Sequence, residues 1–187
     1  MEIISTQIPE VLIVKPDVYE DERGYFLESY NEMRFLENSL ETRFVQDNIS
    51  KSGKGTIRGL HYQIKNKAQG KFCQVITGRV LDIAVDIRFG SPTFGKHVAL
   101  ELSEENHVQL WIPPGFAHGF SVLSDHAIFL YKCTEFYSKQ HERIIIYNDP
   151  QLNINWGIEK PIVSSKDLKG SFFSEIKQDF LYSEMKT

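Results

Sequence analysis

The chain has 187 residues, of which 41% are apolar, 12% aromatic and 25% charged. This balance can bury a hydrophobic core, so it excludes a disordered, collagenous or coiled-coil protein, and the length predicts one domain over residues 1–187. A formal net charge of −4 argues against a general nucleic-acid or membrane-surface binder, because such proteins need a basic stripe.

The predicted elements are mostly β-strands. Short runs rich in β-branched or aromatic residues, bounded by Gly, Pro, Asn, Asp or Ser, predict strands over residues 11–14, 25–29, 44–49, 57–63, 74–77, 80–88, 97–102, 108–112, 119–123, 127–133 and 142–147. Residues 80–87 alternate with a period of two, which predicts a strand with one inward face. Tight hairpin turns are predicted at 77–79 and 89–92.

Helix is predicted in two places only. Asn31 is a preferred N-cap for a short helix over 32–37, and residues 174–184 form the second candidate. Many short strands at close spacing predict an all-β fold, a β-sandwich or barrel of the jelly-roll type with a few short helices.

The chain carries no sign of export or membrane insertion. No apolar run approaches the roughly 18–20 residues that cross a bilayer, and the N-terminus lacks the pattern of a secretory signal. Cys73 and Cys133 lie in apolar contexts and match no zinc or redox spacing, which predicts buried reduced thiols. We therefore expect a cytoplasmic protein.

Three polar clusters interrupt strand-like sequence, at residues 44–63, 111–120 and 129–134. Such groups are costly to bury without partners, and a ligand-lined barrel mouth is a reason to keep them. Each has a purely structural alternative: Tyr131 as an interfacial aromatic, Lys71 as an edge-strand solubiliser and Arg23 as a solvated turn residue. Four further histidines are predicted to be structural: His97, His107, His126 and His141.

A metal site is not expected. The metal-binding cupin pattern combines His-x-His and a nearby Glu with a later Gly-x-x-His. Gly115 and His118 supply the second part, but His61-Tyr62-Gln63 lacks the second histidine and the carboxylate. The pattern thus favours a cupin-like barrel without metal.

Nearly the whole chain resembles the RmlC family, the dTDP-4-dehydrorhamnose 3,5-epimerases. The resemblance is carried in order by residues 21–26, 46–48, 54–63, 69–71, 82–88, 113–118, 130–132, 148–150 and 165–167. It implies a cofactor-free epimerisation of a dTDP-4-keto-6-deoxyhexose. It also implies a homodimer in which an N-terminal segment completes the neighbouring site.

The resemblance assigns roles to individual residues. His61 corresponds to the general base, Asp167 to the carboxylate that orients it, and Tyr131 to the acid on the opposite face of the sugar. Lys71 and His118 correspond to groups near the sugar carbonyl, and Phe26 to a thymine or sugar contact. Contacts to the nucleotide and diphosphate are implied for Arg23, Glu28, Gln46, Asp47, Asn48, Arg58, Glu142 and Lys166.

Two features leave alternatives open. Strict alternation would place Arg58 and His61 on opposite faces of one strand unless Gly59 marks a bulge. Arg143 and Tyr147 depart from the commoner family pattern, which puts substrate preference in question. A mono-epimerase that inverts only C3 or C5, a non-catalytic nucleotide-sugar-binding jelly roll and a metal-dependent cupin oxygenase are the alternative functions.

Overall fold

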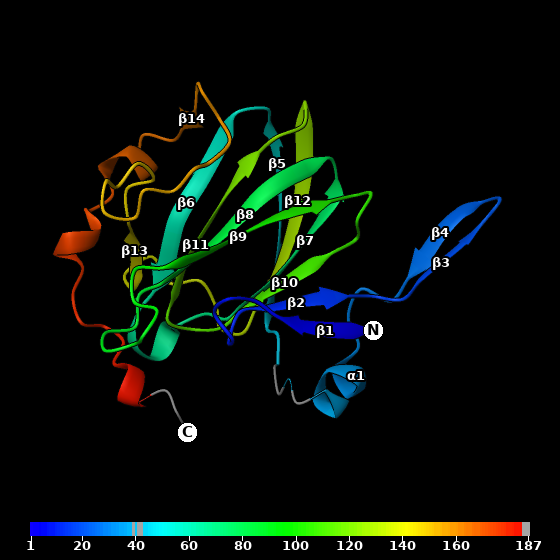
Figure 1. Cartoon of the computed structure of the whole chain (residues 1–187), viewed down its shortest axis with the longest axis horizontal. Helices are drawn as coiled ribbons and strands as arrows, with labels where there is room; N and C mark the ends of the chain where they lie inside the picture. Colours follow the sequence, from blue (N-terminus) through cyan, green and yellow to red (C-terminus); the bar gives the residue numbers. More distant parts are fainter. Residues whose placement is uncertain (39, 41–42, 185–187) are drawn as a thin grey trace.

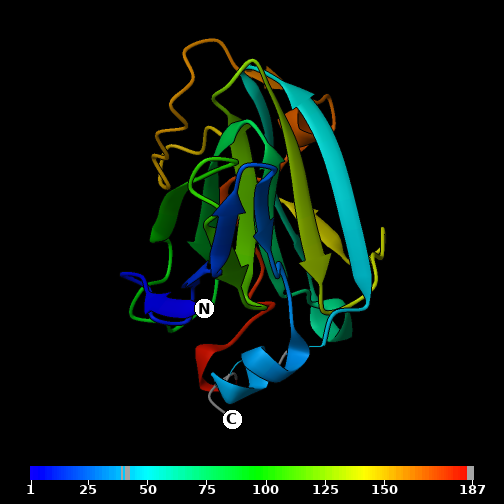
Figure 2. The ribbon, with the colours of Figure 1, turned by 90° about the vertical axis from the view of Figure 1, so that its right-hand side faces the viewer.

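Two β-sheets face each other in the computed structural model, which describes residues 1–38, 40 and 43–184 (Figures 1 and 2). The first sheet has the strand order β1 (Glu2–Ser5), β2 (Leu12–Lys15), β10 (Gln109–Ile112), β7 (Lys71–Thr77), β12 (His126–Cys133) and β5 (Gln46–Gly53). The second sheet has the order β13 (Glu142–Ile144), β6 (Thr56–Gln63), β11 (Phe116–Val122), β8 (Arg79–Asp86) and β9 (His97–Ser103), with β14 (Ile162–Val163) parallel to β6. The predicted all-β jelly-roll class is confirmed.

The remaining regular elements lie outside the two sheets. Strands β3 (Val18–Asp21) and β4 (Gly24–Leu27) form a separate hairpin that projects from the body of the molecule (Figure 1). Helix α1 spans Glu32–Glu37, and four short 3₁₀ turns occupy Lys65–Lys67, Asp167–Lys169, Phe173–Glu175 and Tyr182–Glu184. Within the described residues, no helix has the length and apolar character needed to span a bilayer.

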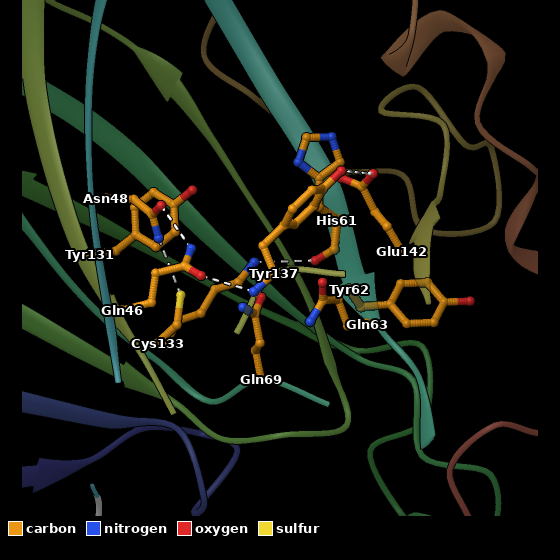
Figure 3. Close-up of a pocket in the computed structure, with 11 residues that line it drawn as sticks. Gln46, Asn48, His61, Tyr62, Gln63, Gln69, Tyr131, Cys133, Tyr137 and Glu142 are labelled. Atoms are coloured by element: carbon orange, nitrogen blue, oxygen red, sulfur yellow. Dashed lines mark hydrogen bonds between the residues drawn. The ribbon is translucent and has the colours of Figure 1, made fainter. Parts of the chain in front are cut away.

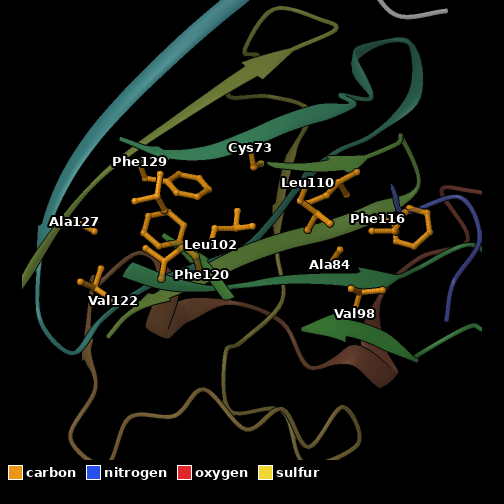
Figure 4. Close-up of a cluster of buried hydrophobic side chains, with 14 of the residues drawn as sticks. Cys73, Ala84, Val98, Leu102, Leu110, Phe116, Phe120, Val122, Ala127 and Phe129 are labelled. Atoms are coloured by element: carbon orange, nitrogen blue, oxygen red, sulfur yellow. The ribbon is translucent and has the colours of Figure 1, made fainter. Parts of the chain in front are cut away.

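The main core lies between the two sheets. Inward side chains of the first sheet, such as Cys73 and Phe129, meet those of the second sheet, such as Ala84 and Phe120 (Figure 4). The rings of Phe120 and Phe129 stack with their centroids 4.3 Å apart. Because strand side chains alternate between faces, this packing defines which residues of each strand point between the sheets.

Strand β8 is buried on both faces, whereas its alternation predicted one inward face. Val80 and Ala84 pack between the sheets, and Ile83 and Val85 pack in a second core on the outer side of the second sheet. The loops after β13 cover that outer side and contribute apolar side chains to it, including Trp156, Phe173 and Phe180. A strand that is buried on both faces of its sheet carries apolar side chains on both faces.

The turn at 77–79 is not a hairpin, contrary to prediction. It joins β7 in the first sheet to β8 in the second, so it is a corner between sheets. Gly78 has a φ of +80°, and a Cβ there would meet the carbonyl oxygen of His126. The turn at 89–92 lies within the connection between β8 and β9, which do pair as antiparallel neighbours.

Of the two predicted helices, one is confirmed and one is wrong. The Asn31 side chain accepts hydrogen bonds from the backbone N–H groups of Met33 and Arg34, which is the predicted N-cap. Residues 174–184 instead contain two 3₁₀ turns separated by extended chain. Phe89 forms backbone hydrogen bonds with Phe180 and Tyr182, and this pairing holds the segment extended.

Candidate active site

A cleft between the sheets gathers most of the predicted site residues. It consists of two hollows that share His61, Lys71 and Tyr131. The Arg58 hollow is completed by Ser50, Arg58, His118 and Phe120. The Gln46 hollow is completed by Gln46, Asn48, Tyr62, Gln63, Gln69, Cys133, Tyr137 and Glu142 (Figure 3). His61 comes from the second sheet and Tyr131 from the first, so the two groups approach one space from opposite sheets.

A β-bulge at Gly59 brings Arg58 and His61 to the same cleft. His61 pairs with His118 and Arg58 with Phe120, so two residues of β6 lie between these pairs where β11 has one. Gly59 has a φ of +127°, and a Cβ there would lie 2.5 Å from the Cα of Gly119. This is the arrangement that the sequence required if both side chains were to reach one ligand.

Replacing Gly59 with alanine is expected to destabilise the protein and to disrupt the cleft. The added Cβ would meet backbone atoms of His118 and Gly119, and the positive φ alone costs about 1–3 kcal/mol for a residue with a side chain. Gly90→Ala is the matched control, because Gly90 has a φ of +82° but no atom lies within 4 Å of the point that its Cβ would occupy. Urea unfolding should show a larger decrease in the free energy of unfolding for Gly59→Ala than for Gly90→Ala. Equal decreases in the two variants would contradict the steric argument.

Asp167 orients His61. Its Oδ1 lies 2.7 Å from His61 Nε2, and the carboxylate is almost completely buried in the 3₁₀ turn Asp167–Lys169. Burial alone would raise the pKa of Asp167, but the hydrogen bond and the charge interaction with His61 outweigh it, and the pKa is lowered. The ionised carboxylate therefore holds the proton on Nε2 and leaves Nδ1 of a neutral imidazole as the basic nitrogen.

Tyr131 is held as a protonated phenol. It lies on β12, between Asn48 of β5 and Cys73 of β7. Burial is the main cause that raises the pKa of Tyr131 to about 12. Its hydroxyl therefore remains a proton donor throughout the neutral range.

Lys71 places a cation beside both groups. Its Nζ lies 5.9 Å from the centre of the Tyr131 ring and donates a hydrogen bond of 3.5 Å to the backbone carbonyl of His61. Lys71 lies on an interior strand of the first sheet with a side chain that is almost fully buried, which excludes the role of edge-strand solubiliser. Burial lowers the pKa of this ammonium group.

Beneath the cleft, His118 belongs to a buried polar cluster. Its Nε2 lies 2.6 Å from Oδ1 of Asp82 and 3.7 Å from Sγ of Cys73. Burial lowers the pKa of His118, and the charge of Asp82 only partly opposes this effect. The ligand atoms of Cys73, Asp82 and His118 lie within 4.8 Å of one another, so these are the residues with which this part of the chain can hold a metal ion.

Comparison with known proteins identifies the family. The family model described as dTDP-4-dehydrorhamnose 3,5-epimerase matches residues 5–175. The chain belongs to the dTDP-4-dehydrorhamnose 3,5-epimerase family. It is 55% identical to the dTDP-4-dehydrorhamnose 3,5-epimerase of Shigella flexneri over 174 residues, which cover 92% of this chain and 96% of that protein.

Solved structures of related epimerases share the fold. A 3,5-epimerase from Legionella pneumophila, in complex with dTDP-4-keto-L-rhamnose, is 50% identical with a TM-score of 0.93, covering 97% of this chain and 98% of that one. A 3'-monoepimerase from Streptomyces bikiniensis, in complex with dTDP-quinovose, is 28% identical with a TM-score of 0.85, covering 91% and 87%. Epimerases that act at two positions and at one position of the sugar therefore share this architecture.

Most residues that the family resemblance singled out meet at the cleft. The residues that line it together with His61 and Tyr131 are Gln46, Asn48, Arg58, Lys71, His118 and Glu142. Lys166 reaches its rim through Glu142, whose two carboxylate oxygens each lie 2.7 Å from Lys166 Nζ. Asp167 contacts the cleft through His61.

Asp47 is placed outside the cleft, contrary to prediction. It lies between Gln46 and Asn48 on β5, and alternation turns its side chain to the opposite face. There it is exposed and forms an ion pair with Lys132, with an N–O distance of 2.9 Å. Three consecutive strand residues cannot all face one ligand.

Three predicted site residues near the N-terminus do not reach the cleft of their own chain: Arg23, Phe26 and Glu28. Arg23 and Phe26 lie on the projecting β3–β4 hairpin, where Arg23 pairs with Asp21 and Phe26 is 69% exposed (Figure 1). Glu28 follows the hairpin and pairs with Arg34 at its base.

The departures from the family pattern lie outside the cleft. Arg143 donates hydrogen bonds to the carbonyls of Gln140 and Glu142 and lines a separate hollow. Tyr147 packs against the outer core of the second sheet. Neither residue lines the cleft, but Arg143 contacts it indirectly, through the backbone of the lining residue Glu142.

Sequence reasoning missed several lining residues: Ser50, Tyr62, Gln63, Gln69, Phe120, Cys133 and Tyr137. The alternation of Gln46, Asn48 and Ser50 along one strand was a usable signal for Ser50. Tyr137 had no such signal, because it lies in the loop between β12 and β13. Its backbone N–H donates to Gln46 and its hydroxyl donates to Glu142.

Proposed function

We propose that this protein is a dTDP-4-dehydrorhamnose 3,5-epimerase, which converts dTDP-4-dehydro-6-deoxy-D-glucose into dTDP-4-dehydro-L-rhamnose. Membership of the family and the high identity to a curated 3,5-epimerase support this activity. The observation that carries the mechanism is that a base, His61, and an acid, Tyr131, line one cleft from opposite sheets. We propose that residues 1–187 act as one cytoplasmic domain.

The ketone at C4 makes this chemistry accessible to ordinary side chains, because it acidifies the hydrogens on C3 and C5. Nδ1 of His61 takes a proton, the C–H bond breaks, and its electron pair moves into an enolate with negative charge on O4. The Tyr131 hydroxyl then donates its proton to the same carbon from the other face, which inverts the centre. His61 then releases its proton to water, and the Tyr131 phenolate takes a proton from water, so both groups return to their starting states.

Lys71 and His118 are suited to stabilise the enolate. Both lie beside the two reacting groups, and a cation or N–H donor aimed at a developing oxyanion is commonly the largest electrostatic contribution to catalysis. Arg58 donates its Nε hydrogen to Ser52 and faces the Arg58 hollow, where a guanidinium suits a diphosphate oxygen pair. We assign Gln46, Asn48, Glu142 and Lys166 to the nucleotide end.

We further propose a homodimer in which the β3–β4 hairpin completes the site of the partner subunit. The hairpin carries three exposed aromatic side chains, Tyr19, Tyr25 and Phe26, and it extends away from its own cleft (Figure 1). Exposed aromatic surface of this kind is typical of a protein interface.

Mixed dimers test the exchange. Arg23→Ala and His61→Asn variants are each expected to be inactive alone, and to regain activity after they are unfolded and refolded together. Half of the dimers would then be mixed, and each would have one complete site, so about a quarter of the wild-type rate should return. A mixture no more active than the mean of its two parents would show that Arg23 does not serve the partner's site.

The activity itself is tested by proton NMR of dTDP-4-keto-6-deoxyglucose with the protein in D₂O. We expect loss of the C3 and C5 signals and formation of the L-lyxo product. Deuterium at one position only would indicate a mono-epimerase. No exchange at either position would favour the non-catalytic binding protein.

A further inference from the structure

We propose that Cys73, Asp82 and His118 form an inhibitory binding site for a thiophilic divalent cation such as Zn²⁺. All three side chains are buried, and their ligand atoms lie within 4.8 Å of one another. They come from three strands: Cys73 from β7 in the first sheet, and Asp82 from β8 and His118 from β11 in the second. Figure 4 shows Cys73 at the border of the apolar core.

The spacing suits a tetrahedral ion. Zinc lies about 2.3 Å from a thiolate and about 2.0 Å from an imidazole nitrogen, which separates the two ligand atoms by roughly 3.5 Å. The observed distance from Cys73 Sγ to His118 Nε2 is 3.7 Å. Asp82 Oδ1 lies closer to that nitrogen, at 2.6 Å, because a hydrogen bond joins them. The carboxylate must move outward or turn when an ion replaces that proton.

Asp82 itself points to a ligand. Its side chain is fully buried, and among the described residues its Oδ2 has no hydrogen-bond partner. The carboxylate is hydrogen-bonded by His118 and by the Cys73 thiol, yet within the described part of the chain its Oδ2 keeps no partner of its own. A buried carboxylate oxygen without a partner is destabilising, so these two contacts do not fully account for the group. An ion held by Oδ2, the thiolate and the imidazole would satisfy it.

The charges balance when the ion binds. Zn²⁺ is neutralised by the Asp82 carboxylate and the Cys73 thiolate, whose proton is released to water. The imidazole stays neutral, and its proton moves from Nε2 to Nδ1. The mixed sulfur, nitrogen and oxygen donors favour Zn²⁺ or Co²⁺ over the hard cations Mg²⁺ and Ca²⁺.

The cleft provides both the entry path and the inhibition. His118 lines the Arg58 hollow with His61, Lys71 and Tyr131, and its Nε2 belongs to the buried cluster, so the shortest path for an ion leads from the hollow past the imidazole ring. The bound ion separates His118 from Asp82 and shifts the imidazole proton from Nε2 to Nδ1, so the N–H donor that the proposed function assigns to His118 is displaced. The inhibition depends on the proposed epimerase activity, whereas metal binding does not.

Cobalt titration of the full-length, chelator-treated protein tests the binding. A thiolate-to-cobalt charge-transfer absorption is expected at a stoichiometry of one ion per chain, and Zn²⁺ should abolish it by competition. Cys73→Val should lack the absorption. Cys133→Val is the matched control, because Cys133 is also a buried cysteine near Lys71 but lies outside the cluster, so it should keep the absorption.

A wild-type spectrum without the absorption, or one that Cys73→Val retains, would overturn the proposal. Cys73→Ser, checked by circular dichroism, serves in the same assay if the valine variant does not fold. Zn²⁺ should also slow epimerisation by the wild type, but not by the Cys73 variant relative to its own metal-free rate. Equal inhibition of both would overturn the inhibitory role. A protein that shows the cobalt absorption but never epimerises the sugar would instead refute the proposed function.

Discussion

His61→Asn is expected to lose both epimerisation and solvent exchange, each by about 10²–10⁴-fold, the usual contribution of a positioned general base. The amide keeps the size of the side chain and can still contact Asp167, but it cannot accept a proton from C3 or C5. The measurement is deuterium incorporation into the 4-keto substrate from D₂O, followed by NMR, with folding checked by circular dichroism.

His126→Asn is the matched control for this result. His126 is an exposed histidine at the start of β12 and does not line the cleft, so its replacement should leave the exchange rate unchanged. Exchange that survives in folded His61→Asn at the wild-type rate would rule out His61 as the base. Loss of deuterium exchange in both variants would point to a general effect of histidine replacement.

Tyr131→Phe is expected to separate exchange from inversion. The phenyl ring fills the same space but has no proton to give, so inversion should fall by about 10²–10⁴-fold. His61 and Asp167 remain, so the enolate still forms, and His61 can return deuterium to the face from which it took the proton. The variant should therefore exchange hydrogen with retention of configuration, at a rate far above its rate of inversion.

NMR distinguishes the outcomes, because the recovered substrate should carry deuterium while the product does not accumulate. Since burial raises the pKa of Tyr131 to about 12, deprotonation of this phenol should not limit the wild-type rate at neutral pH. A Tyr131→Phe variant that inverts both centres at the wild-type rate would show that another group donates the proton. A variant that loses exchange and inversion equally would place Tyr131 in proton abstraction as well.

The amino-acid pattern predicted the elements on which this site is built. The β-branched and aromatic runs at 57–63 and 127–133 are the strands β6 and β12 that carry His61 and Tyr131, and Asn31 caps the predicted helix. These features depend on neighbours a few residues away, so they can be read locally. The resemblance, carried by motifs spread along the chain, supplied the candidates whose clustering the structure then showed.

Tertiary structure decided how those elements meet. The turn at Gly78 leads from one sheet to the other because its flanking strands pair with different neighbours. Residues 174–184 form no continuous helix because Phe180 and Tyr182 pair with Phe89 through their backbones. The bulge at Gly59 turns Arg58 and His61 to one side. The outward register of Asp47 and the projecting hairpin place other predicted contact residues away from the cleft of their own chain. The sequence alone determined the chemistry of each residue and the spacing of apolar residues that favours a strand or a helix. It did not determine which distant strands pair or in what register, because that depends on long-range packing that no short pattern encodes.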